Sequence, residues 1–213
     1  MKKKVKAEKF FKREELERIT NTIHEVESHT IGEVAVMVVD SSDHYIEAEI
    51  LGGIFLASLL SLVMTTLNFH SSIWAYISLS FILFFPSKYL FDKIPVLKTA
   101  FMGVKRKETA VMQRAERAFY EKGLYKTKKN TGVLFFLSLL ERKLWILADK
   151  GIYEKIDQET LNKFAKSVSQ GIRDGRACDA LCEAIRESGE LLAKHFPITP
   201  DDTDELSDEV MTE

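Results

Sequence analysis

Acidic and polar side chains stand where two predicted strands end and where another begins. Asp40 and Asp43 follow the first apolar run of strand length. Asn130 precedes the second such run, and Asp149 closes the third. Functional sites of α/β proteins lie where strand ends and loops converge, and Ca²⁺ or Mg²⁺ requires several converging oxygen ligands. These four residues are therefore a candidate Ca²⁺ or Mg²⁺ site; the alternative is that they cap turns and are solvated.

Arg142 is the candidate anion-binding residue, because it stands in the turn between the second and third runs. A guanidinium can bind a phosphate or carboxylate there, although an arginine beside Glu141 can equally be solvated. Phosphatase chemistry needs an activated nucleophile or paired metal ions. The chain has no Cys-x5-Arg signature, and its histidines are dispersed over positions 24, 29, 44, 70 and 195. We therefore assign no catalytic residue.

The two cysteines, Cys178 and Cys182, are spaced i, i+4 on a predicted helix. Because there is no further cysteine and histidine is scattered, the pair does not indicate a zinc site. Two reduced cytosolic thiols are the expected state.

The elements that must position these residues follow from the hydrophobic pattern. Apolar runs predict strands, and apolar residues at spacings of three and four predict amphipathic helices. The predicted strands are Gly32–Asp40, Thr131–Leu139 and Lys143–Asp149, with Glu141 and Arg142 in the turn between the last two. The predicted helices are Ala7–Ser28, Glu108–Lys122, Asp157–Ile172 and Arg176–His195. This order predicts an α/β fold in which helices cover a sheet.

Two long apolar stretches interrupt this domain, at about residues 50–69 and 73–91, joined by the uncharged linker Asn68–Ser72. A helix needs roughly 20 apolar residues to span a bilayer, so the stretches predict an antiparallel transmembrane hairpin. Trp74, Tyr76 and Tyr89 stand near the ends of the stretches, where interfacial aromatic residues are expected. The alternative is a buried helical hairpin in a soluble core.

The distribution of basic residues predicts which side of the membrane holds the domain. Lys and Arg mark the cytoplasmic ends of membrane spans, and the linker contains neither. They gather at the amino terminus and after the second stretch, at Lys88, Lys93, Lys98, Lys105, Arg106 and Lys107. We therefore expect a multi-pass protein of the cell (inner) membrane with both termini in the cytoplasm.

Composition narrows the class of partner. The 213 residues carry a formal net charge of −2, which argues against nucleic-acid binding, because that function requires a clearly basic domain. The segment from about residue 199 to 213 is acidic and poor in apolar residues. Such a composition predicts a disordered or loosely docked tail; the alternative is a docking motif for a basic partner.

Several of these segments resemble the TPM domain family. The middle block of the chain, Asn130–Ile152, is the most specific part of this resemblance. The residues that carry it are Phe10–Glu27, Thr30–Val36, Arg117–Phe119, Gly123–Leu124, Thr127, Asn130–Leu134, Glu141–Ile152 and Gly189–Pro197. It implies an α/β sandwich around a short mixed sheet. It also implies one of three activities: weak acid phosphatase, calcium binding, or an accessory role in the maintenance of membrane complexes. Two loops that are acidic or glycine-rich in the family are reduced here, at Lys129–Gly132 and Asp149–Gly151.

The expected organisation is a TPM-like α/β sandwich interrupted by a transmembrane hairpin. Its parts are residues 1–49, the hairpin at 50–91, residues 92–198, and the acidic tail at 199–213. The expected function is that of a membrane-anchored accessory factor whose partners are the lipid bilayer and a membrane protein complex. A weak metal-dependent phosphatase and a Ca²⁺-binding regulatory domain are the alternatives, with Ca²⁺ or Mg²⁺ as the candidate cofactor.

Overall fold

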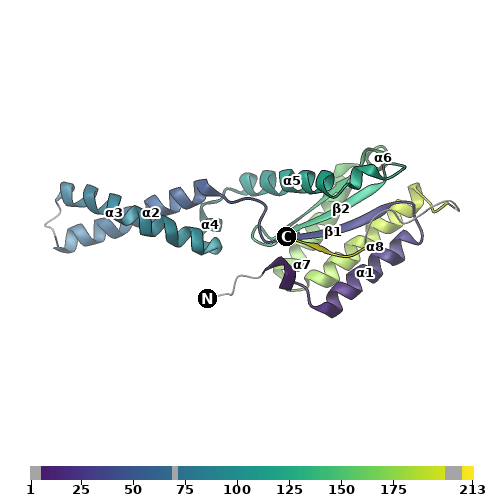
Figure 1. Cartoon of the computed structure of the whole chain (residues 1–213), viewed down its shortest axis with the longest axis horizontal. Coiled ribbons are helices and arrows are strands. Elements are labelled where there is room, and N and C mark those ends of the chain that lie inside the picture. Colours follow the sequence, from purple (N-terminus) through teal and green to yellow (C-terminus); the bar gives the residue numbers. More distant parts are fainter. Residues whose placement is uncertain (1–5, 69–71, 200–207) are drawn as a thin grey trace. The chain divides into compact units, whose positions relative to one another are not determined.

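The computed structural model describes residues 6–68, 72–199 and 208–213, and the chain divides into two compact units (Figure 1). The α/β unit comprises Met1–Ser42 and Glu108–Glu213, and the helical unit comprises Asp43–Lys107. The α/β unit is therefore assembled from two separate parts of the sequence.

A four-stranded mixed sheet with the order β3-β2-β1-β4 forms the centre of the α/β unit. Its strands are β1 (Glu33–Val39), β2 (Gly132–Ser138), β3 (Lys143–Ala148) and β4 (Met211–Thr212). β1 is parallel to both β2 and β4, and β2 is antiparallel to β3. Every residue of β1 and β2 is buried, because helices cover both faces of the sheet. The predicted α/β sandwich with a short mixed sheet is confirmed.

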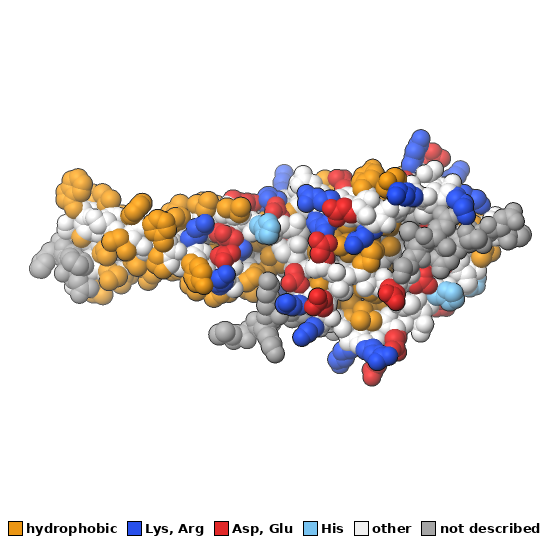
Figure 2. Space-filling model, viewed as in Figure 1, with side chains coloured by type: hydrophobic (Ala, Val, Ile, Leu, Met, Phe, Trp, Pro, Cys, Tyr) orange, Lys and Arg blue, Asp and Glu red, His pale blue; other side chains and the backbone are white. Residues whose placement is uncertain are grey.

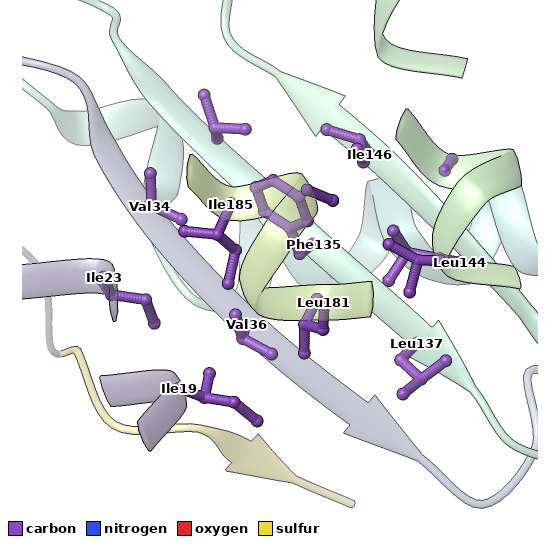
Figure 3. Packing of buried hydrophobic residues seen from close by; sticks show 14 of the residues in the cluster. Ile19, Ile23, Val34, Val36, Phe135, Leu137, Leu144, Ile146, Leu181 and Ile185 are labelled. Carbon is purple, nitrogen blue, oxygen red and sulfur yellow. The ribbon is translucent and has the colours of Figure 1, made fainter. Parts of the chain in front are cut away.

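The alternation of side chains along β1 and β2 divides the core into two layers. On one face, β1 and β2 pack against α1 (Arg13–Glu27), α7 (Gln158–Arg173) and α8 (Ala177–His195). Figure 3 shows Ile19, Ile23, Leu181 and Ile185 from these helices against Val34, Val36 and Phe135 of the strands. On the other face, Ala35, Met37, Leu134 and Phe136 pack against α5 (Val104–Glu121).

The amino-terminal helix differs from its predicted range. A 3₁₀ turn, η1 (Ala7–Lys9), is followed by a break, and α1 begins only at Arg13. The break occurs because the side chain of Phe11 is buried in the core and Lys12 is extended. The Lys12 amide then donates to Glu15 Oε2 at 2.7 Å, which satisfies one of the free amides at a helix start. The prediction of one continuous helix over Ala7–Ser28 is wrong.

Three short elements of the α/β unit were not predicted. They are η2 (Leu124–Lys126), α6 (Lys150–Tyr153) and β4. Of the predicted acidic tail, Thr199 and Asp208–Glu213 lie within the described residues. Met211 and Thr212 form an edge strand beside Met37 and Val38, so this part of the predicted disordered or loosely docked tail is docked.

The helical unit contains α2 (Ile46–Asn68), α3 (Ile73–Lys93) and α4 (Pro95–Phe101). α2 and α3 are antiparallel and approach closely at one end, where a Cβ atom added to Gly52 would meet the Phe91 ring and one added to Gly53 would meet the Lys88 backbone. Farther along, the hydroxyls of Ser58 and Tyr76 form a hydrogen bond of 2.7 Å. Ile46–Leu67 and Ile73–Lys93 are each long and apolar enough to span a bilayer.

The base of the helical unit, where α2 begins and α4 packs, holds a network of ion pairs. Lys98 Nζ lies 2.5 Å from Glu49 Oε1, and both side chains are 90% buried. Arg106 pairs with Asp43 and Glu47 and also lies over the Tyr45 ring. Four chain segments are thereby joined at the end of the hairpin that carries the charged residues.

Candidate functional site

The strand register separates the predicted cation ligands between the two ends of the sheet. Val39 is level with Ser138, and Ser138 is level with Lys143, so Asp40 and Arg142 lie at one end. Glu33 is level with Gly132, and Val133 is level with Ala148, so Asn130 and Asp149 lie at the other. Seven strand residues separate these ends by roughly 20 Å. The structure therefore brings Asn130 and Asp149 together and does not bring Asp40 to them.

Asp149 is the predicted ligand whose surroundings suit a cation best. It is the N-cap of α6, where its Oδ1 accepts a hydrogen bond of 2.7 Å from the Lys150 amide. Its Oδ2 is buried and has no hydrogen-bond partner among the described residues. A buried carboxylate oxygen without a partner is unfavourable, so Oδ2 is available to a cation.

The loop before β2 is held close to Asp149 by a tight backbone contact. Asn130 has a positive φ of 55°, a conformation that asparagine tolerates better than most residues. A Cβ atom on Gly151 would lie 2.6 Å from the Asn130 carbonyl oxygen and 2.9 Å from that of Lys129. The glycine therefore allows these two carbonyl oxygens to approach the start of α6.

At the opposite end of the sheet, Asp40 and Glu141 hold the backbone in place. Asp40 Oδ1 accepts a 2.6 Å hydrogen bond from the Ala7 amide, which connects η1 to the end of β1. Glu141 is buried and accepts hydrogen bonds from the Ser42 amide at 3.1 Å and from the Ser138 hydroxyl. Arg142 is exposed, with a φ of 51° in the turn. Asp40 and Glu141 thus have structural partners, and Arg142 extends from a tight turn.

Asp43 belongs to the helical unit, where it pairs with Arg106 and accepts a hydrogen bond of 2.7 Å from the His44 amide. Partial burial alone would raise the pKa of Asp43, but the Arg106 guanidinium and the His44 amide lower it below its ordinary value. Asp43 is therefore an anionic partner for Arg106 at the base of the hairpin.

The candidate cation site reduces to Asp149 and the loop that contains Asn130, because the other predicted ligands lie elsewhere. Within residues 6–68, 72–199 and 208–213, no three His, Cys, Asp or Glu side chains are grouped so that they could hold a metal ion. Calcium prefers six to eight oxygen ligands. Such a site would have to take most of its ligands from backbone carbonyls and water.

Sequence reasoning did not identify a group of carboxyl side chains around Glu27. Glu27 accepts a hydrogen bond of 2.7 Å from the Val34 amide and also hydrogen-bonds Asp208. Burial raises the pKa of Glu27 to about 9, and the nearby Asp208 and Glu33 add to the shift. Glu27 is therefore protonated at neutral pH. No sequence spacing indicates this group, because its members come from α1, β1 and the C-terminal segment.

The cysteine pair is structural. Cys178 and Cys182 are free thiols buried on α8. Burial, with the neighbouring Cys182, raises the pKa of Cys178 to about 12. Since the thiolate is the nucleophilic form, Cys178 is unreactive at neutral pH.

Comparison with solved structures supports the same architecture. The chain is similar to the NMR structure of the BA42 protein from the psychrophilic bacterium Bizionia argentinensis, with a TM-score of 0.61 and 20% sequence identity. The alignment covers 98% of this chain and 99% of that one. At this identity the likeness shows the fold alone.

Comparison with family models gives one match over part of the chain. No curated protein matches the chain, but the model of the TPM domain matches residues 98–191. The matched range includes β2, β3, α6 and α7, and most of α8. It therefore contains Asn130, Asp149 and the turn at Arg142. The predicted resemblance is therefore confirmed over residues 98–191, which match the model of the TPM domain.

Proposed function

We propose that this chain is a membrane-anchored TPM-domain protein that acts as an accessory factor for a membrane protein complex. In this proposal α2 and α3 cross the bilayer as a hairpin, and the α/β unit works on the cytoplasmic face of the cell membrane. It carries out no catalysis of its own there but contacts another membrane protein.

The observation that carries the proposal is the apolar surface of the hairpin. Figure 2 shows hydrophobic side chains along α2 and α3. Large side chains more than half exposed include Phe55, Leu62, Trp74, Phe81, Ile82 and Phe85. Only 28% of the apolar window of α2 and 6% of that of α3 is buried, whereas a core helix of a soluble protein is mostly buried. A soluble monomer rarely exposes so large a continuous apolar surface.

The interior of the hairpin also suits a bilayer. The segment from Ile50 to Ser87 contains no Asp, Glu, Lys or Arg, and helices satisfy their backbone groups internally, as a hydrocarbon environment requires. The hydrogen bond between Ser58 and Tyr76 pairs two polar side chains within the hairpin. Such pairs stabilise helix contacts in membranes.

The orientation is inferred from the charged base of the helical unit. All Asp, Glu, Lys and Arg residues of Asp43–Lys107 stand before Ile50 or after Ser87, and both ends of the hairpin meet there. The basic residues Lys88, Lys93, Lys98, Lys105, Arg106 and Lys107 outnumber the acids Asp43, Glu47, Glu49 and Asp92. The rule that positive charge stays inside therefore favours a cytoplasmic base.

Topology can be tested by cysteine labelling in intact cells. Ser72→Cys, at the exposed start of α3, should react with a membrane-impermeant maleimide added outside. Glu8→Cys, exposed in η1, should react only after lysis. The native thiols are buried and provide a background that reacts after denaturation. Reaction of Ser72→Cys from the cytoplasmic side alone, or release of the chain from membranes by alkaline carbonate, would overturn the proposal.

The accessory role can be tested by affinity capture of the detergent-solubilised full chain. We expect at least one integral membrane protein to co-purify reproducibly. The control is the Tyr120→Arg chain, which lacks one exposed apolar side chain of α5. A protein held only by a nonspecific apolar contact with that side chain should not co-purify with this variant. Recovery of lipid and chaperones alone would count against an accessory role.

A second candidate function is weak binding of Ca²⁺ or Mg²⁺, favoured by the unpartnered Oδ2 of Asp149. Calorimetric titration of the full chain should show weak binding that Asp149→Ala abolishes. Asp40→Ala should leave the binding unchanged, because the sheet separates Asp40 from Asp149. Identical isotherms for wild type and Asp149→Ala would exclude this site.

Phosphatase activity is the remaining alternative that the resemblance implies. Among the described residues, no three His, Cys, Asp or Glu side chains are grouped so that they could hold the metal ions that one route of this chemistry needs. We expect hydrolysis of an aryl phosphate no faster than that of the Asp149→Ala variant. A clear excess of wild-type activity would restore the enzyme hypothesis.

A further inference from the structure

The C-terminal segment, Asp208–Glu213, closes the edge of β1 that faces away from β2. The Glu213 amide donates to the Val38 carbonyl oxygen at 3.0 Å, and the Asp40 amide donates to the Glu213 carbonyl oxygen at 3.0 Å. Farther back along this edge, the Val34 amide donates to Glu27 Oε1. Without the segment, the backbone of β1 around Val38 would present unpaired donors and acceptors, which is a template for another strand.

Side chains of the segment contact both layers of the domain. Val210 packs against the core that contains α1 and α8, and Met211 packs against the opposite core, beneath α5. The carboxylate of Glu213 pairs with Arg114, whose side chain is only 11% exposed. The edge therefore accommodates two successive apolar residues and an acidic residue two positions after the second.

The segment is also held at its first residue. Asp208 hydrogen-bonds Glu27, and its Oδ2 lies 3.5 Å from His24 Nδ1. The Thr20 hydroxyl donates to the Asp208 carbonyl oxygen at 3.3 Å. These contacts all involve side chains of α1, so α1 and β1 together form the binding surface.

The strand pairing between the segment and β1 is short compared with the pairing between β1 and β2. Only Met211 and Thr212 pair with β1, whereas seven residues of β2 do so. Glu209, Thr212 and Glu213 are exposed. An open groove of about 580 Å³ lies beside the segment, lined by Leu16, Thr20, Glu209 and Val210 among others. Few buried contacts would be lost if the segment left the edge, as in locally opening regions of proteins.

We propose that the β1 edge is an acceptor site for an extended acidic strand of a partner protein, and that Asp208–Glu213 is its internal occupant. The partner strand pairs parallel to β1 and displaces the segment, with an apolar pair against the two core layers and a carboxylate on Arg114. This mode of recognition takes affinity from backbone hydrogen bonds and specificity from alternate side chains. The inference rests on the proposed accessory function and names the surface that would contact the partner.

The test uses a fluorescent peptide with the sequence of Asp208–Glu213 and the full chain shortened to end at residue 207, in detergent. Anisotropy should show saturable binding to the shortened chain and much weaker binding to the complete chain, whose own segment competes for the edge. A peptide with Glu213→Gln should bind about tenfold more weakly, the loss expected for one charge-assisted hydrogen bond. A peptide with Met211→Asp should not bind measurably.

A matched change in the protein separates specific recognition of the peptide from nonspecific adsorption. With Arg114→Met in the shortened chain, the native peptide and the Glu213→Gln peptide should bind equally. Three results with a folded shortened chain would overturn the proposal. The chain binds none of the peptides, it binds all three peptides with the same affinity, or its edge pairs with a second copy of the chain and excludes the peptides.

Hydrogen exchange on the complete chain tests the same idea if the shortened chain does not fold. The Asp40 amide is bonded to Glu213, and the Leu139 amide is bonded to Val39 at the same end of the sheet, on the β2 side, also at 3.0 Å. A displaceable segment predicts that the Asp40 amide exchanges about a hundredfold faster than the Leu139 amide. Equal exchange rates would show that the segment opens only with the whole domain. Neither measurement depends on a bilayer or a captured partner, so their failure is distinct from failure of the accessory role.

Discussion

At the scale of single residues, the ionisation of Glu27 opposes folding. Its pKa is raised from 4.5 to about 9 in the folded chain, chiefly by burial. Between these two pH values the folded chain holds a proton that the unfolded chain has lost. The stability that this group contributes is therefore complete below pH 4.5 and is lost progressively as the pH rises towards 9.

Glu27→Gln should remove this pH dependence, because glutamine mimics the protonated carboxyl group and can still accept from the Val34 amide. We expect the variant to be more stable than wild type at about pH 8, by on the order of 1–3 kcal/mol, and equal to it near about pH 4.5. The measurement is denaturant unfolding in detergent, followed by Trp145 fluorescence in a Trp74→Phe background. Glu25→Gln, at an exposed position on the same helix, is the control. An unchanged pH slope in Glu27→Gln would contradict the prediction.

The sequence could locate some site residues and not others. Asn130 and Asp149 were predicted to lie together because each adjoins a recognisable strand, and the structure places them at the same end of the sheet. Asp40 was grouped with them because the direction of each strand in the sheet could not be read from apolar runs. Glu27 and Asp208 were missed, since their proximity depends on the path of a segment with little hydrophobic pattern.

At the scale of elements, α4 is attached to α2 by a buried ion pair. Lys98 also donates to the His44 carbonyl oxygen at 3.3 Å, and Phe101 of α4 packs against Phe55 and Phe91. A buried ion pair contributes little net stability, but losing one partner leaves a charge that is expensive to bury.

Lys98→Met should therefore destabilise the helical unit by about 3–5 kcal/mol, because the Glu49 carboxylate loses its partner. Addition of Glu49→Gln should recover much of that loss. The control is Lys93→Met, which removes a pair with Asp92 in which each side chain is about half exposed, and which should cost at most about 1 kcal/mol. Thermal unfolding in detergent, followed by Trp74 in a Trp145→Phe background, distinguishes them. Equal losses for Lys98→Met and Lys93→Met would show that the pair is solvated.

Element prediction succeeded where burial imposes a strong pattern. β1, β2 and β3 agree with their predicted ranges to within one residue at each end, because their residues are largely apolar and flanked by polar loops. α4 was missed because Pro95 indicates a break, although proline is well tolerated in a first helical turn. β4 was missed because two residues are too few to show a hydrophobic periodicity. Met211 and Thr212 form a strand only because they pair with the backbone of β1.

At the scale of the whole molecule, the environment of the hairpin can be tested by a single charge. Leu62 is 53% exposed in α2. Leu62→Arg would cost about 2.5–3.5 kcal/mol for insertion near the centre of a membrane span, but almost nothing in water. We expect a large drop in the fraction of chain that resists carbonate extraction. Tyr120→Arg, at a 65% exposed apolar position of α5, should leave that fraction unchanged. Full membrane retention of Leu62→Arg would place α2 outside the hydrocarbon layer.

The position of β1 in the sheet has a consequence for biosynthesis. Both strands that pair with β1 are encoded after the hairpin. At about 5–20 residues per second, the ribosome needs on the order of 5–20 s to make residues 40–131. During this interval the nascent chain carries a seven-residue strand, apolar except for Glu33, without a pairing partner, while the next segment to emerge is the hairpin. The α/β unit can be completed only after the hairpin has been made. In the proposed membrane arrangement, delayed insertion of the hairpin should therefore appear as aggregation of the nascent amino-terminal segment.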